Sequence, residues 1–287
     1  WTKRRAWKWM NDTPLKGIKL NSLDEAAEWL NQHASDGVYN TMTVNLSYKQ
    51  YNQTGITAYG EKLGALAAKA NNAGIKLIPV FFKSGELASS KQYMAQYISN
   101  IMGKFYNDRR FEGWCLFDQT STDEPSDYKN VFQYIFSYVR YVFPNQPMFA
   151  APMLDASQQA DSTAADFNNY MWQLSDVVAF NTPDGAEVSS SQLENLFTAY
   201  ERPLFFMNTR KLQDGFAPLH VNWVAAEQLD ANEVKNFKNT PLYIVKDGDT
   251  NKMPSWKAWA MVNNEPVKGL SYSSADAALA GISAQGP

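Results

Sequence analysis

The sequence predicts an α/β fold, a single (β/α)8 barrel, and three observations lead to it. Short β-type apolar runs alternate with amphipathic helical segments along most of the 287 residues. Eight such runs can be counted, which is the number a closed parallel barrel needs, whereas five or six would favour an open doubly wound sheet. The glycine-rich phosphate loops of open nucleotide-binding sheets, GxGxxG and GxxxxGK[ST], do not occur in the sequence.

The predicted strands are runs rich in β-branched and aromatic residues, bounded by polar or turn-forming residues. In chain order they are residues 5–10, 39–46, 76–82, 113–117, 148–153, 177–181 and 204–208, with a last strand at 242–245 or 256–262. The parallel strands of a barrel share one direction. Their C-terminal ends should therefore meet on one face, where barrel active sites lie.

The predicted helices lie between these strands and repeat their apolar residues at helical spacing. They are residues 23–33, 59–72, 91–106, 128–143, 164–174, 191–200 and 224–237. Asn21 or Ser22 and Asp127 precede two of them, and their side-chain oxygens can accept hydrogen bonds from the free amides of a first helical turn. Gly74 and Pro144 follow the ends of two others.

Composition favours one domain over residues 1–287, with an elaborated last unit around 211–262 and a small polar C-terminal tail. Because 26 Lys+Arg stand against 29 Asp+Glu without a basic run, we expect no nucleic-acid partner. The longest apolar runs break within about ten residues, so no integral membrane segment is expected. The chain begins at Trp1, which fits a processed protein that is secreted, periplasmic or on the cell surface.

Cys115 is the one cysteine in the sequence, so an internal disulfide, a CxxC redox pair and a thiolate zinc site are excluded. Its place in the run WCLF predicts a small buried hydrophobe. The segment KDGDTN at 246–251 opens like a calcium loop, but Lys252 stands where glycine should follow and Ala258 where the distal glutamate belongs. We therefore expect no metal site and no cofactor.

The strongest functional signal is the stretch 111–127, FEGWCLFDQTSTDEPSD, where an apolar strand ends in a loop rich in carboxylates. Hydrolysis of a glycosidic bond needs an acid to protonate the leaving oxygen and a second group at the anomeric carbon. Glu124 is the candidate acid because nearby carboxylates would raise its pKa, and Asp118 or Asp155 is its candidate partner. The alternative is a solvated turn that caps the following helix through Asp127.

The other residues expected on the C-terminal rim are mainly amides, carboxylates and tryptophans. Such a mixture suits a polyhydroxylated ligand, because polar groups bind hydroxyls and indole faces cover the C–H surface of a sugar. Carbohydrate, as an oligo- or polysaccharide, is therefore the expected partner. The candidate substrate-binding residues are Trp9, Asn45, Gln119, Asp123, Asn181, Asn208, Arg210 and Trp259, and further rim residues are Asn11, Asp12, Tyr48, Lys83, Glu86, Asp184 and Asp247.

Two segments resemble the chitinase and endo-β-N-acetylglucosaminidase group of (β/α)8 barrels. FEGW at 111–114 is similar to the F-D-G-x entry of that group's fourth strand, and AAPML at 150–154 is similar to its later alanine-proline segment. The resemblance implies a glycosidase-like barrel. The group's G-x-D-x-D-x-E motif, laid on Gly113, places Cys115, Phe117 and Gln119 where its three acids stand. DEP at 123–125 also looks like loops in uncharacterised bacterial glycosidase-like barrels.

Three functions follow from these observations. The first is a glycoside hydrolase that acts on a polysaccharide or glycan by carboxylate acid–base catalysis at the C-terminal face. The second is a glycan-binding barrel that has lost its hydrolytic residues. The third is an enzyme of small-molecule metabolism, with Lys83 as a Schiff-base lysine. The late loops NTRKLQDG and KDGDTN lack the consecutive glycines of a phosphate site, which disfavours the phosphate-binding enzymes of this class.

Overall fold

The computed structural model describes most of the first 182 residues and several later strands. The described parts are residue 15, residues 17–87, 90–121, 128–154 and 162–182, and the segments 192, 195–196, 199–200, 204–207, 221–223, 243–246, 256–262 and 265–272.

The centre of the protein is an all-parallel arrangement of strands taken in chain order. One sheet contains β1 (Gly17–Leu20), β2 (Thr41–Asn45), β3 (Lys76–Lys83), β4 (Trp114–Asp118) and β5 (Met148–Ala151), in that order. A second sheet contains β6 (Val178–Phe180), β7 (Leu204–Phe206) and β8 (Val221–Trp223). A parallel bridge between Met153 and Asn181 joins the end of β5 to the end of β6.

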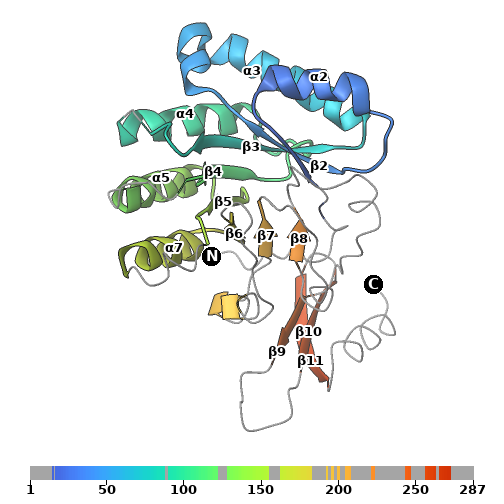
Figure 1. The fold of residues 1–287 in the computed structure, drawn as a ribbon, viewed down its shortest axis with the longest axis vertical. Coiled ribbons are helices and arrows are strands. Elements are labelled where there is room, and N and C mark those ends of the chain that lie inside the picture. Colours follow the sequence, from blue (N-terminus) through green and yellow to red (C-terminus); the bar gives the residue numbers. More distant parts are fainter. Residues whose placement is uncertain are drawn as a thin grey trace.

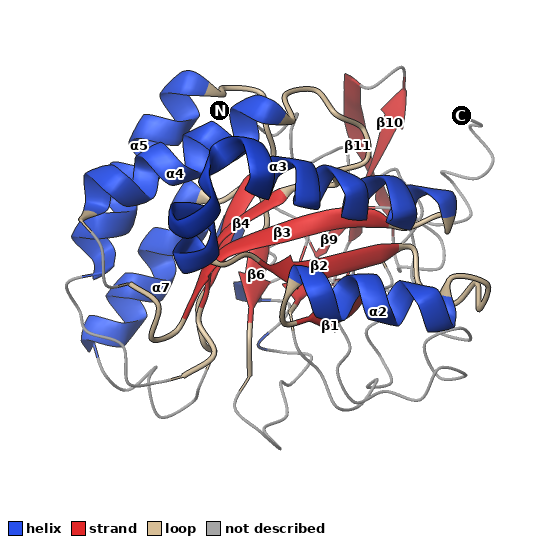
Figure 2. Ribbon diagram, turned by 90° about the horizontal axis from the view of Figure 1, so that it is seen from above, coloured by secondary structure: helices blue, strands red, loops and turns tan. Residues whose placement is uncertain are grey.

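Helices cover the outer face of the parallel strands (Figures 1 and 2). Those with determined bounds are α2 (Leu23–His33), α3 (Tyr48–Asn72), α4 (Lys91–Lys104), α5 (Tyr128–Val142) and α7 (Ser162–Leu174). An N-cap serine precedes three of these helices. Ser22, Ser47 and Ser90 each accept, through Oγ, a hydrogen bond from an amide in the first turn. The expected helix of 191–200 is helical at its described residues, and 224–237 lies outside the described residues.

Helix α3 begins earlier than its apolar periodicity predicts. The predicted start was Tyr59, but helix begins at Tyr48 and is interrupted at Gly55, whose φ of 84° and ψ of 166° are not helical. Glycine takes this φ without the penalty that a Cβ would cause. The short first part of α3 follows β2 directly and therefore lies at the C-terminal ends of the strands.

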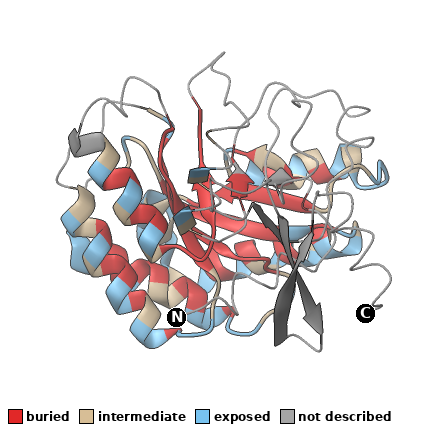
Figure 3. Ribbon diagram, turned by 90° about the horizontal axis from the view of Figure 1, so that it is seen from below, coloured by how far each residue is buried: buried red, intermediate tan, exposed pale blue. Residues whose placement is uncertain are grey.

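The buried apolar side chains of the described residues form two cores, one on each face of the parallel strands. Figure 3 shows these central strands coloured as buried. The outer core lies between strands and helices and includes Leu20, Val44 and Phe117. The inner core gathers residues from β3 to β7, including Val80, Cys115 and Phe149, together with Leu15. Strands that are buried on both faces are typical of α/β proteins with a parallel sheet.

The structure changes the predicted strand order after β7 and adds a strand before β2. The first strand of the described sheet is Gly17–Leu20, whereas the predicted 5–10 lies outside the described residues. The prediction missed β8. Neither choice for a last parallel strand was right, because β9 (Tyr243–Lys246), β10 (Trp256–Val262) and β11 (Glu265–Tyr272) form a separate antiparallel sheet.

Candidate functional site at the C-terminal edge of the strands

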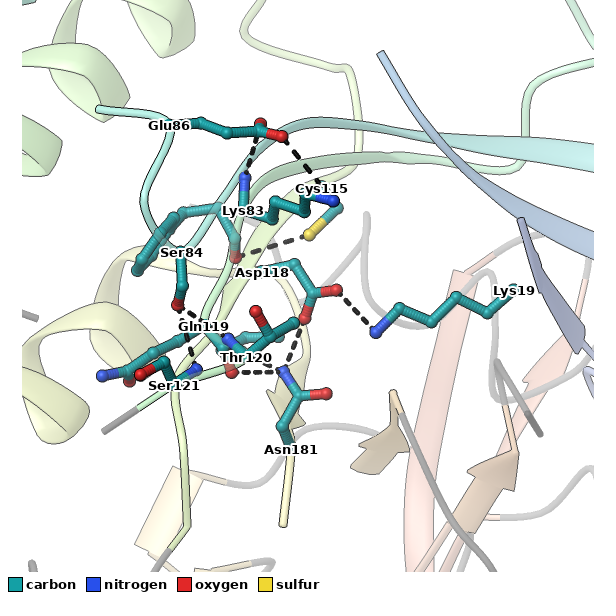
Figure 4. Close-up of polar contacts among 12 residues, drawn as sticks. Lys19, Lys83, Ser84, Glu86, Cys115, Asp118, Gln119, Thr120, Ser121 and Asn181 are labelled. Carbon is teal, nitrogen blue, oxygen red and sulfur yellow. Dashed lines mark hydrogen bonds and ion pairs between the residues drawn. The ribbon is translucent and has the colours of Figure 1, made fainter. Parts of the chain in front are cut away.

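Asp118 is the last residue of β4 and occupies the centre of a buried polar cluster (Figure 4). Its side chain is fully buried, and Oδ2 lies 2.9 Å from Nζ of Lys19. Its Oδ1 accepts a 2.5 Å hydrogen bond from Nδ2 of Asn181. The negative charge of Asp118 is thus balanced by the ammonium group of Lys19, whose side chain is only 5% exposed.

The structure brings three of the predicted site residues together: Asp118, Gln119 and Asn181. Besides its bond to Asp118, Asn181 Nδ2 donates to the backbone carbonyl of Gln119 at 2.9 Å. The side chain of Gln119 accepts, through Oε1, a 2.7 Å hydrogen bond from the amide of Met153. These contacts tie together the C-terminal ends of β4, β5 and β6.

Lys19 is a member of this cluster that the sequence analysis missed. It lies on β1, where Leu20 belongs to the outer core and Ile18 packs against that core. Because successive side chains of a strand point to opposite faces, Lys19 lies on the inner face. The alternation in GIKL could have revealed this, had residues 17–20 been assigned to a strand.

The loop after β3 is held against the loop after β4. Lys83 and Asp118 are register partners at the ends of the two strands. Beyond them, Ser84 Oγ accepts hydrogen bonds from the amides of Thr120 at 2.9 Å and Ser121 at 3.1 Å. These contacts fix the β3 loop, which includes Glu86, beside the buried cluster.

Glu86 carries the carboxyl group of the β3 loop. Its Oε2 accepts a 3.1 Å hydrogen bond from the amide of Lys83, and its Oε1 lies 3.9 Å from Nζ of the same lysine. Partial burial raises the pKa of Glu86. The amide and ammonium of Lys83 oppose that pKa shift, and the charge of Asp118 adds to it.

A pocket of about 740 Å³ opens at the C-terminal ends of β1, β2 and β3. Its wall is formed mainly by neutral polar and tyrosine side chains, and Glu86 is the acid among its lining residues. Asn45 lines it from the end of β2; the side chain is almost fully buried, and within the described part of the chain Oδ1 has no hydrogen-bond donor. The lining residues are Asn21, Ser22, Leu23, Asn45, Leu46, Ser47, Tyr48, Lys49, Gln50, Asn52, Gln53, Tyr59, Gly85 and Glu86.

A group of tyrosines supports this pocket from α3 and α4. Tyr59 is buried, and its hydroxyl oxygen accepts a 2.7 Å hydrogen bond from the amide of Ser47. The ring of Tyr97 packs against those of Tyr48 and Tyr51, with centroids 5.1 and 4.6 Å apart. Burial raises the pKa of both Tyr59 and Tyr97, so their hydroxyls are neutral hydrogen-bonding groups at ordinary pH.

The remaining predicted site residues cannot be placed in this cluster. Residue 9, the acids at 123, 124 and 155, and residues 208 and 210 lie outside the described residues. Trp259 belongs to β10 of the antiparallel sheet rather than to the end of a parallel strand. The predictions for these residues therefore stay predictions.

Two further features are absent from the described residues. Among them, no group of three or more His, Cys, Asp or Glu side chains is placed to hold a metal ion. No helix in the same part of the chain is long and apolar enough to span a bilayer.

Comparison with known proteins adds a relationship of fold. No protein-family model matches the chain, and no curated protein sequence matches it. Among solved structures, an endoglucanase of Pseudomonas stutzeri is similar with a TM-score of 0.53 at 11% identity, over 74% of this chain and 84% of that one. An endo-β-1,4-glucanase of Xanthomonas axonopodis pv. citri gives a TM-score of 0.53 at 12% identity, over 72% and 81%.

At such low identity the likeness is one of fold alone. The protein thus has a glycosidase-like α/β fold with parallel strands, and its polar cluster and pocket lie at the strand ends. In barrel enzymes this is the edge that carries the active site.

Proposed function

We propose that the protein is a glycoside hydrolase that acts on a polysaccharide or other glycan at the C-terminal edge of its parallel strands. The observation that supports this most is the pocket of about 740 Å³, lined by amides, hydroxyls, tyrosines and the carboxyl of Glu86. Neutral polar groups recognise sugar hydroxyls, and a carboxyl beside them can supply acid–base catalysis. The fold shared with two endoglucanases supports the same reaction class.

In this proposal Glu124 protonates the glycosidic oxygen, and Asp118 or Asp155 is its partner. The proposed glycan-binding residues are Trp9, Asn45, Gln119, Asp123, Asn181, Asn208, Arg210 and Trp259. Of the members of this set that the structure describes, Asn45 lines the pocket.

The same proposal extends to the closure of the barrel, the functional analogy and the location of the protein. We infer that β8 returns to β1 to close a complete eight-stranded barrel within one domain, and that the function is analogous to that of chitinases and endo-β-N-acetylglucosaminidases. An inner core that takes residues from β3 to β7 supports closure, because an open flat sheet would keep these residues apart. The proposed location is outside the cytoplasm.

A panel of oligosaccharides and polysaccharides, analysed for products by mass spectrometry, tests this function. The parent protein should release products, and Glu124→Gln should abolish release while oligosaccharide binding is retained, because only the transferable proton is lost. Products from both proteins at equal rates would remove Glu124 from the mechanism. If the parent protein neither cleaves nor binds any glycan of the panel, the proposed function is wrong.

One observation favours a second function, a glycan-binding barrel without hydrolysis. Asp118 is fully buried and its charge is already balanced by Lys19, so it is a constrained group for catalysis. In that case the same panel should give saturable binding without products, and the binding should depend on rim tryptophans such as Trp9.

A further inference from the structure

The structure distinguishes two carboxyl groups near the pocket by their surroundings. Asp118 is fully buried, with one oxygen bonded to Asn181 and the other beside the ammonium of Lys19. Glu86 lies in the neighbouring loop, has a side chain that is 35% exposed, and lines the pocket. A group that reacts with a bound ligand must reach the ligand, and of these two acids Glu86 is the one that lines the pocket.

We propose that Glu86 is the second catalytic carboxylate of this site and takes a proton from the water that attacks the anomeric carbon. This inference rests on the proposed glycoside hydrolase function. In this inference Glu86 takes the place of Asp118 or Asp155 as the second carboxylate, and Asp118 has an electrostatic and positioning role beneath the site.

The chain holds Glu86 in a defined orientation. Its Oε2 is fixed by the amide of Lys83, which leaves Oε1 beside the ammonium of that residue. The turn between them needs a φ of 82° at Gly85, and Ser84 bonds two amides of the β4 loop. A base fixed by its own loop loses little orientational freedom when substrate binds.

The reaction in this proposal is a direct displacement by water. The water oxygen bonds to the anomeric carbon while one of its protons passes to the Glu86 carboxylate. The bond between that carbon and the glycosidic oxygen breaks, its electron pair stays on the oxygen, and this oxygen takes a proton from the general acid of the proposed function. One water is consumed, two hydroxyl groups are formed, and the anomeric configuration is inverted.

The surroundings of Glu86 act on its basicity in two opposite ways. Burial makes Glu86 more basic than an ordinary glutamate, and the amide and ammonium of Lys83 keep its ionised form accessible. The other groups that face it are Asp118, Tyr59 and Tyr97, and Lys49 is exposed at the pocket wall.

The test compares Glu86→Gln with the parent protein on the glycan that the parent cleaves. Loss of a general base should lower kcat by about 100- to 10,000-fold with little change in oligosaccharide binding. Glu61→Gln is the matched control, because Glu61 is exposed on α3, and it should leave kcat unchanged. Circular dichroism of each variant establishes that the fold is retained.

A rescue experiment separates chemistry from structure. In Glu86→Ala, sodium formate should restore part of the lost rate, because a small carboxylate can occupy the vacated place and accept the proton. Proton NMR of the first product should show the inverted anomer. A parent without activity on any glycan would overturn the proposed function. An active parent whose Glu86→Gln and Glu86→Ala variants keep full activity would overturn the role of Glu86 alone.

Discussion

Lys19 of β1 and Asp118 of β4 form a 2.9 Å ion pair although β2 and β3 lie between their strands in the sheet. Neighbouring strands are about 4.8 Å apart, so in a flat sheet these two backbones would be separated by roughly 14 Å. The two side chains can cover only part of that distance. The contact therefore requires a strongly curled sheet whose inner face turns toward itself.

Removal of the positive partner should destabilise the protein. Lys19→Met would leave the carboxyl group of Asp118 buried without its cationic partner, and breaking a buried pair in this way costs about 3–5 kcal/mol of unfolding free energy. Urea denaturation followed by circular dichroism measures the change. Lys19→Met with Asp118→Asn should recover much of the loss, because no unbalanced charge remains.

Lys62 provides the control for that experiment. It pairs with Asp24 at 2.8 Å, but both side chains are well exposed, so Lys62→Met should change the unfolding free energy by less than about 1 kcal/mol. Equal losses for Lys19→Met and Lys62→Met would show that the buried pair does not support the fold.

Lys83 should set the pH at which the site becomes active. Its ammonium lowers the pKa of Glu86, so Lys83→Met should raise that pKa, while the backbone amide of residue 83 still binds the carboxylate. If Glu86 works as a base, activity appears as pH rises through its pKa. The acidic limb of kcat against pH should therefore move to higher pH in Lys83→Met, and Lys62→Met, outside the pocket lining, should leave the limb nearly in place. A shift toward lower pH would contradict the assignment.

Shortening a side chain in the inner core should lower the free energy of unfolding, whereas shortening one on the outer helix surface should change it little. Phe149 is fully buried in the inner core, and Phe149→Ala should cost about 3–5 kcal/mol of unfolding free energy. Tyr141 on α5 is 88% exposed, and Tyr141→Ala should stay within about 0.5 kcal/mol of the parent. The two losses are compared from the urea midpoints of unfolding, provided that the dependence of the unfolding free energy on urea concentration keeps the same slope.

Cys115 should be unreactive in the folded protein. Burial raises the pKa of its thiol well above the ordinary value of 9.0, with a further contribution from Asp118. Alkylation by iodoacetamide at pH 8 should be slow in buffer and complete in denaturant, as measured by mass spectrometry. Above pH 9 the unfolded thiol ionises before the folded one, so this group should lower stability as pH rises further. Rapid alkylation in buffer would mean that the inner core opens.

The repeating units of the fold could be predicted from local patterns. Helix α2 has the predicted bounds of 23–33, and β2 to β7 coincide with predicted strands to within a few residues. In each case apolar spacing and a polar boundary carry the signal over a short window. Residues 17–20 and 221–223 were missed because runs of three or four residues contain too little pattern. The strands after residue 242 were predicted to join the parallel sheet but form an antiparallel one, because the apolar character of a strand does not specify its partner.

The sequence by itself determined the alternation of strands and helices and the polar character of the strand ends. It identified Asp118, Gln119 and Asn181 as edge residues, and the structure brings them together. Only the tertiary structure decided that Lys19 balances Asp118 and that Glu86 lines the pocket. The physical reason is that charge balance and burial depend on distances between strands, and those distances follow from the curl of the sheet rather than from any local run of residues.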